Sequence, residues 1–208
     1  IIPLSDAADN VGGEGASNPS FAIGGAAYLK PWFDFYRAEV ITDSLTITAG
    51  DGVGATPPIS SFFGDKPTLE IMNLMGFDAD GLGNHNFDRG DAYLRETLIP
   101  LARFPYLSAN LVGADGKTPA DWSPSKVFDF GDGQRLGLIG FSNPDIPQLV
   151  SPGNLGSFGV GDPAQAVSAE AARLKAEGVT WIVAMGHMGA TAGTLENPTG
   201  PLIELADK

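Results

Sequence analysis

The chain contains no cysteine, few basic residues and no long apolar run. Without cysteine it forms no disulfide, no thiolate zinc site and no cysteine nucleophile. Its 12 lysines and arginines stand against 25 aspartates and glutamates, a net charge of −13. Because binding to nucleic acid phosphates depends on lysine and arginine, we expect no nucleic acid polymer as a partner. No segment reaches the ~18–20 apolar residues of a membrane span, and residues 1–3 lack the initiating methionine and basic segment of a signal peptide.

Helical and strand-like segments alternate along the 208 residues, which suffice for one domain with a substantial core. Periodicity and end signals predict helices over residues 26–39, 67–75, 91–103, 163–174 and 202–206, the first of them begun or bent by Pro31. Alternating or short apolar runs predict strands over residues 1–4, 44–49, 77–82, 106–110, 127–130, 136–141 and 179–185, the last one buried. Residues 131–133 predict a hairpin turn. The alternation indicates a layered α/β core, antiparallel at the hairpin.

Four predicted strands each lead to a side chain that can bind a divalent cation: Asp6, Asp51, Asn84 and His187. Glycine directly precedes the last three and lets the backbone turn sharply. Ligands in open α/β sheets collect beyond the carboxyl ends of the strands, so we expect these four side chains to converge. A carboxylate shared by two cations, with amide and imidazole ligands beside it, suits a two-metal hydrolase. Asp78 and Asp80 alternate within one of these strands, and we interpret them as structural or solvent-facing.

His85 and Asp88 lie three residues apart and can form a second functional unit. A histidine oriented by a carboxylate can donate a proton to the leaving oxygen of a substrate. Each candidate also has a simpler interpretation. Asp51 can be a turn residue, His187 a half-buried structural histidine, and Asp6 and Asp88 helix caps.

The segments around these residues resemble the calcineurin-type metallophosphoesterases, specifically the bacterial 5′-nucleotidase/UDP-sugar hydrolase (2′,3′-cyclic phosphodiesterase) branch. The similar segments cover nearly the whole chain: residues 48–51 with Pro57, Ser60 and Ser61, then 72–78, 83–90, 104–111, 138–141 and 184–189. Two positions depart from the family. Asn86 stands where the family more often has glutamate, and Ala8 stands where its first motif has a histidine two residues after the aspartate.

The resemblance implies an α/β fold of two packed mixed β-sheets flanked by helices. Residues 1–208 would form an N-terminal metallophosphoesterase domain, without the family's last metal-binding motif and its C-terminal substrate domain. The cofactors implied are two divalent metal ions, with Mn, Zn, Fe or Co compatible with the mixed ligands. In the implied site, Asp51 bridges both metals, Asn84 and His187 bind the second, and Asp6 binds the first.

The resemblance further implies that Asn84 and His85 contact the substrate. His85, oriented by Asp88, would stabilise the phosphate or protonate the leaving group. The implied function is metal-dependent hydrolysis of nucleoside 5′-phosphates or related phosphoesters, including 2′,3′-cyclic phosphodiesters, in the periplasm or outside the cell. The expected partner is a small phosphoester or nucleotide.

Three alternatives stay open at this point. The first is an enzyme that uses the same metal centre on another ester or on a sulfur substrate. The second, favoured by Ala8, is a non-catalytic or weakly active binding domain with a degenerate first metal site. The third is an α/β scaffold whose stability does not respond to metal. We expect the given chain on its own to bind metal weakly and to hydrolyse little.

Overall fold

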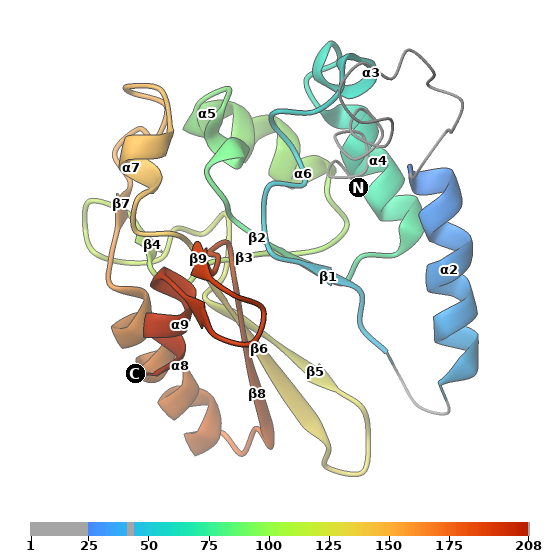
Figure 1. Cartoon of the computed structure of the whole chain (residues 1–208), viewed down its shortest axis with the longest axis vertical. Helices are drawn as coiled ribbons and strands as arrows, with labels where there is room; N and C mark the ends of the chain where they lie inside the picture. Colours follow the sequence, from blue (N-terminus) through green and yellow to red (C-terminus); the bar gives the residue numbers. More distant parts are fainter. Residues whose placement is uncertain (1–24, 41–43, 208) are drawn as a thin grey trace.

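A computed structural model of the chain describes residues 25–40 and 44–207, in which two three-stranded β-sheets lie between helices on either side (Figure 1). This arrangement confirms the predicted α/β class. The strand predicted over residues 1–4 and the candidate ligand Asp6 lie outside the described residues, as does Ala8.

The first sheet is parallel in its described part and has the order β1 (Ile47–Thr48), β2 (Ala79–Gly81), β3 (Tyr106–Leu107). Each strand is shorter than the segment predicted for it. Successive parallel strands need a crossover connection, and helices supply it here.

Two helices lie at one side of this sheet (Figure 1). The first, α2 (Ala26–Glu39), has the predicted bounds and contains Pro31 in its interior. The second, α4 (Lys66–Met75), ends at Gly76, whose φ of 72° gives the left-handed conformation that closes many helices. Arg37 donates hydrogen bonds to two carbonyl oxygens at the C-terminus of α4, both at 2.8 Å, and so joins the two helices.

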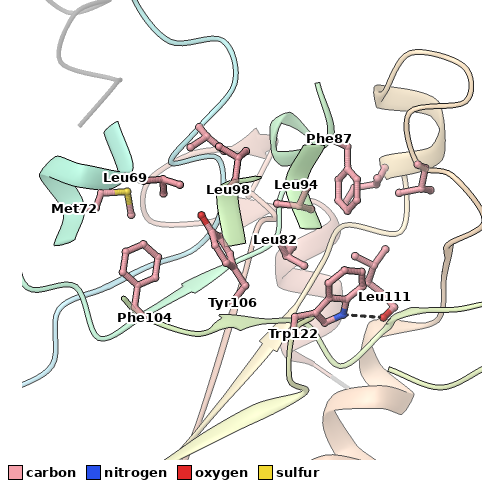
Figure 2. Packing of buried hydrophobic residues seen from close by; sticks show 13 residues of the cluster. Leu69, Met72, Leu82, Phe87, Leu94, Leu98, Phe104, Tyr106, Leu111 and Trp122 are labelled. Atoms are coloured by element: carbon pink, nitrogen blue, oxygen red, sulfur yellow. Dashed lines mark hydrogen bonds between the residues drawn. The ribbon is translucent and has the colours of Figure 1, made fainter. Parts of the chain in front are cut away.

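The connection from β2 to β3 begins with a 3₁₀ turn and continues as one interrupted helix. Its parts are η1 (His85–Phe87), α5 (Asp91–Tyr93), the π-helical turn η2 (Leu94–Leu98) and α6 (Ile99–Leu101). The helix predicted over residues 91–103 is therefore present, with a π-helical centre. This interrupted helix contributes Leu94 and Leu98 to the largest described apolar cluster, which Figure 2 shows. The other labelled members are Leu69, Met72, Leu82, Phe87, Phe104, Tyr106, Leu111 and Trp122.

The second sheet has the order β5 (Ser125–Asp129), β6 (Arg135–Phe141), β8 (Trp181–Gly186). The predicted hairpin joins β5 to β6 antiparallel, and β8 is parallel to β6. The prediction of a buried strand over residues 179–185 is wrong for its centre. Trp181 and Val183 are 47% and 40% exposed, because β8 pairs only with β6 among the described residues and is an edge strand there.

The predicted helix after Asp162 is α8 (Pro163–Ala176), which packs on β6. Asp162 accepts a hydrogen bond from Gln165 N at 2.9 Å, the expected N-cap contact. The remaining described elements are short: α3 (Pro58–Ser61), β4 (Leu111–Val112), α7 (Ile146–Leu149), β7 (Gly159–Val160), β9 (Ala192–Gly193), β10 (Pro198–Thr199) and α9 (Pro201–Ala206). In the described part of the chain, no helix has both the length and the apolar character needed to cross a bilayer.

The two three-stranded sheets pack on each other through four buried apolar residues, one from each of four strands: Ala79, Leu107, Leu138 and Met185. β2, β3, β6 and β8 contribute them, so the carboxyl ends of β2 and β8 are held close together. This contact brings residues from distant parts of the sequence close together.

Candidate active site

The carboxylate of Asp51 lies at the centre of the site, in the turn that follows β1. Its Oδ1 accepts a hydrogen bond from His85 N at 2.9 Å, and its Oδ2 lies 2.8 Å from Nε2 of His187. These contacts come from the ends of three strands in two different sheets. The predicted convergence of Asp51, His187 and the segment around Asn84 is therefore present.

Two glycines make this approach possible. A Cβ atom on Gly50 would lie 2.7 Å from Gly83 N, and Gly50 has a φ of 103°, which favours glycine. A Cβ atom on Gly83 would lie 2.7 Å from Cγ of Asp51 and 3.0 Å from Cγ of His187. Any larger side chain at Gly83 would thus push the carboxylate and the imidazole away.

Asn84 is partly exposed and stands at the start of η1. Its two neighbours in sequence both touch Asp51, Gly83 through close packing and His85 through the backbone hydrogen bond. The fold therefore places the residue predicted as an amide ligand beside the central carboxylate.

His85 and Asp88 form the predicted pair. The Nδ1–H group of His85 donates to Oδ2 of Asp88 at 2.9 Å, and Ala55 N donates to the same oxygen at 3.2 Å. The backbone oxygen of Asp88 accepts from Asn154 Nδ2 at 2.9 Å. With Nδ1 occupied, Nε2 of the imidazole is available to another partner, and the ring is 40% exposed. The helix-cap interpretation of Asp88 is wrong, since Gly90 precedes α5.

Electrostatics tie His187 to the site. The hydrogen bond to Asp51 is the main cause that raises the pKa of His187 above its usual value, against partial burial, which acts to lower it. The protonated form of the imidazole is therefore favoured more than in a free histidine, and in that form it would neutralise the carboxylate. A divalent cation at Asp51 would compete with that proton.

The donor set fits part of a divalent metal centre. A carboxylate, an imidazole and a neighbouring amide are the oxygen and nitrogen ligands that Mn, Zn, Fe and Co accept. Within residues 25–40 and 44–207, however, no group of three or more histidine, cysteine, aspartate or glutamate side chains is placed to hold a metal. The role predicted for Asp6 stays a prediction.

Two residues that shape the site were not predicted to do so. Asn86 is buried, and its Oδ1 accepts hydrogen bonds from Gly83 N at 2.8 Å and from Asp51 N at 3.2 Å. Asp80 is fully buried, and its Oδ1 accepts from Gly50 N at 2.9 Å. The solvent-facing interpretation of Asp80 is wrong and the structural one is right. An aspartate between the small residues Ala79 and Gly81, within a predicted strand, was the signal in the sequence that could have found it.

Comparison with known proteins gives relatives but no matching family model. The chain is 30% identical to cell wall protein Lmo0130 of Listeria monocytogenes, over 89% of this chain and 28% of that protein. It is 35% identical to the 5′-nucleotidase of Mus musculus, over 83% of this chain and 30% of that protein. The chain therefore spans less than a third of the length of either relative.

Among solved structures, the chain resembles the calcineurin-like phosphoesterase YfkN from Bacillus subtilis with a TM-score of 0.67. The match covers 82% of this chain and 56% of that one, at 24% sequence identity. At this level of identity the likeness concerns the fold, and it confirms the predicted fold class.

Proposed function

Because the chain belongs to the 5′-nucleotidase family of calcineurin-like phosphoesterases, we propose that it forms the N-terminal domain of a divalent-metal-dependent hydrolase of phosphate esters. The observation that carries this proposal is the convergence on one carboxylate. Asp51 contacts His187 from β8 and His85 from the turn after β2, and the His85–Asp88 pair lies directly beside it.

Asp51, Asn84 and His187 are the described residues that would hold the metal, with Asp6 as a further ligand. Bound divalent ions would polarise the phosphoryl oxygens and lower the pKa of a water molecule to make it a nucleophile at neutral pH. The glycines at positions 50 and 83 keep the space around Asp51 free of other side chains.

His85 moves the proton in this proposal. In the imidazolium form of His85, Asp88 accepts from Nδ1–H and fixes the ring, and Nε2–H contacts the phosphate and donates its proton to the leaving oxygen, which leaves the neutral imidazole. Because the ring is 40% exposed, a small phosphoester can reach it without a rearrangement of the core.

Nucleotides are the first substrates to test, since the Mus musculus relative is named a 5′-nucleotidase. The Listeria relative is named a cell wall protein, which supports an address outside the cytoplasm. We extend both properties to this chain as part of the proposal.

The test combines metal binding with turnover. Mn²⁺ is added to the metal-free form of the whole protein that contains this domain, the shift in melting temperature is recorded, and hydrolysis of AMP and of a 2′,3′-cyclic nucleotide is assayed by phosphate release. Asn84→Ala should abolish turnover and weaken Mn²⁺ binding, whereas His85→Ala should lower turnover by ~10²–10⁴-fold and leave metal content intact. Gln134→Ala, in the hairpin at the far end of the second sheet, is the control for an amide lost elsewhere.

A second function, a non-catalytic or weakly active binding domain, is favoured by one observation. In the described part of the chain, Oδ2 of Asp51 lies 2.8 Å from Nε2 of His187, and no group of three or more histidine, cysteine, aspartate or glutamate side chains is placed to hold a metal. That reading predicts a small Mn²⁺ shift and no phosphate release. Unchanged activity in Asn84→Ala would contradict the metal-dependent enzyme outright.

A further inference from the structure

Asp80 lies in β2, next to the turn that carries Asp51. Its side chain is fully buried, and only one of its oxygens is used among the described residues: Oδ1 accepts from Gly50 N at 2.9 Å. Oδ2 has no hydrogen-bond partner there, and neither does the buried hydroxyl group of Tyr106, the residue opposite Asp80 on β3. Burial of a carboxyl group with an unpaired oxygen destabilises a fold. An aspartate at position 80 therefore costs stability, and this cost points to a role of Asp80 in the neighbouring site.

The turn formed by Gly50 and Asp51, which Asp80 contacts, has a backbone conformation that must be held by its surroundings. Gly50 and Asp51 both have positive φ, 103° and 56°, and a residue other than glycine rarely adopts this conformation. Such a conformation persists where the surroundings hold it in place. The two consecutive N–H groups of the turn are held by side chains from the β2 region, Gly50 N by Asp80 and Asp51 N by Asn86.

We propose that Asp80 is a positioning residue, whose Oδ1 anchors Gly50 and thereby directs the carboxylate of Asp51 toward His187 and the segment around Asn84. The inference deepens the proposed function and rests on it, because Asp51 is the central ligand there. Asp80 itself contacts Gly50 and the underside of the turn, and it acts on the site through the backbone.

This anchor requires a hydrogen-bond acceptor and no negative charge. Burial raises the pKa of Asp80 well above its usual value, and the nearby charge of Asp51 acts in the same direction, so the neutral acid is favoured. Asparagine has the same shape and keeps an acceptor oxygen in place of Oδ1. Leucine has a similar volume and removes the acceptor.

Asp78 provides a matched control. It precedes Asp80 by two residues, and its Oδ2 accepts from Thr46 N at 2.7 Å, the same kind of bond to the segment that contains β1. This bond lies at the opposite end of β1 from Asp51. Substitution of Asp78 therefore removes a carboxylate–backbone contact between the same two segments without touching the turn.

The experiment measures Mn²⁺ affinity by calorimetry and, in the metal-free protein, hydrogen exchange of individual backbone amides by NMR. We expect Asp80→Leu to weaken Mn²⁺ binding by ~10–100-fold and Asp80→Asn to stay within about threefold of wild type. In Asp80→Leu the Gly50 amide should lose its protection while amides of the central strand β6 keep theirs. Asp78→Leu should expose the Thr46 amide and leave the Mn²⁺ affinity unchanged.

Two other results would overturn the positioning role of Asp80, and two further cases have a defined next step. Wild-type Mn²⁺ affinity in Asp80→Leu overturns the positioning role, and so does an equal loss in Asp80→Asn, because the charge would then be what matters. If Asp80→Leu fails to fold, Asp80→Ala replaces it with the same expected results. If wild-type protein binds no Mn²⁺, the proposed function fails, and the Gly50 amide in the metal-free variants still tests the anchor.

Discussion

At the scale of single residues, the site depends on space that one glycine leaves open. Gly83→Ala would place a methyl group against the carboxylate of Asp51 and 3.0 Å from Cγ of His187. We expect this variant to lose at least ~10-fold in Mn²⁺ affinity, with a parallel loss of phosphoester hydrolysis, because the ligands are displaced. Gly159→Ala is the control, since a Cβ atom there meets nothing within 4 Å. Calorimetry and phosphate release compare the two, and an intact site in Gly83→Ala would contradict the packing described.

The buried carboxyl group of Asp80 makes a second prediction, for stability against pH. Because the pKa of Asp80 is raised in the folded state, the unfolded chain releases this proton at lower pH than the folded one. The contribution of Asp80 to stability is therefore full below the usual aspartate value of 3.8 and falls as the pH rises above it. Asp80→Asn removes this loss, so its melting temperature should exceed that of wild type by a margin that grows from pH 4 to pH 7. Equal melting curves at pH 7 would show an ionised, compensated carboxylate.

The side chains proposed to bind metal or substrate were easier to predict from the sequence than the side chains that position them. Asp51, His85, Asp88 and His187 follow strand ends, and the structure brings them together. Asn86 and Asp80 act by accepting backbone N–H groups, an interaction without a spacing rule in sequence. Their roles depend on their contact with the turn formed by Gly50 and Asp51. That contact forms only when the strands have packed together.

At the scale of elements, helix α8 is fixed to strand β5 by a polar contact. Glu170 of α8 accepts hydrogen bonds from Ser125 at the start of β5 and from Arg173 one turn further along the helix, the latter at 2.6 Å and 2.9 Å. The bond from Arg173 is the main cause that lowers the pKa of Glu170 below its usual 4.5, against its burial. The carboxylate is therefore favoured in the folded state.

The sign of this shift gives a third prediction. The contribution of Glu170 is present above the usual value of 4.5 and is lost as the pH falls through the lower pKa of the folded state. Because Arg173 is 47% exposed, the pair contributes about 1 kcal/mol or less. Urea unfolding at pH 7 should show Glu170→Gln less stable than wild type, with the difference shrinking below pH 4.5. Glu96→Gln, at an exposed helical position, should have the same free energy of unfolding as wild type at pH 7 and below pH 4.5.

Element types were predictable where the signal is local, and burial was not. The bounds of α2 and the hairpin between β5 and β6 follow from periodicity and turn residues, and both are confirmed. The apolar run of β8 gave the correct strand but the wrong environment, since exposure depends on which strands pair at its free edge. Pairing partners come from distant parts of a chain, and local periodicity does not report them.

At the scale of the whole molecule, the site is shared between two sheets. Asp51 follows β1 of the first sheet, and His187 follows β8 of the second. The contact of 2.8 Å between them therefore depends on how the sheets pack, and the packing residues are Ala79, Leu107, Leu138 and Met185. The geometry of the site is thus a property of the fold as a unit.

The last prediction tests this dependence by weakening the interface between the sheets. Leu138 is 1% exposed and lies between them, so Leu138→Ala should lower the free energy of unfolding by about 2–5 kcal/mol through lost burial and the cavity left behind. Mn²⁺ affinity, measured well below the melting temperature, should fall as well, because β8 can then shift His187 relative to Asp51. Leu74→Ala, at a position 71% exposed on α4, should change neither quantity. A destabilised Leu138→Ala protein with wild-type Mn²⁺ affinity would show that the loops hold the ligands in place independently of the sheets.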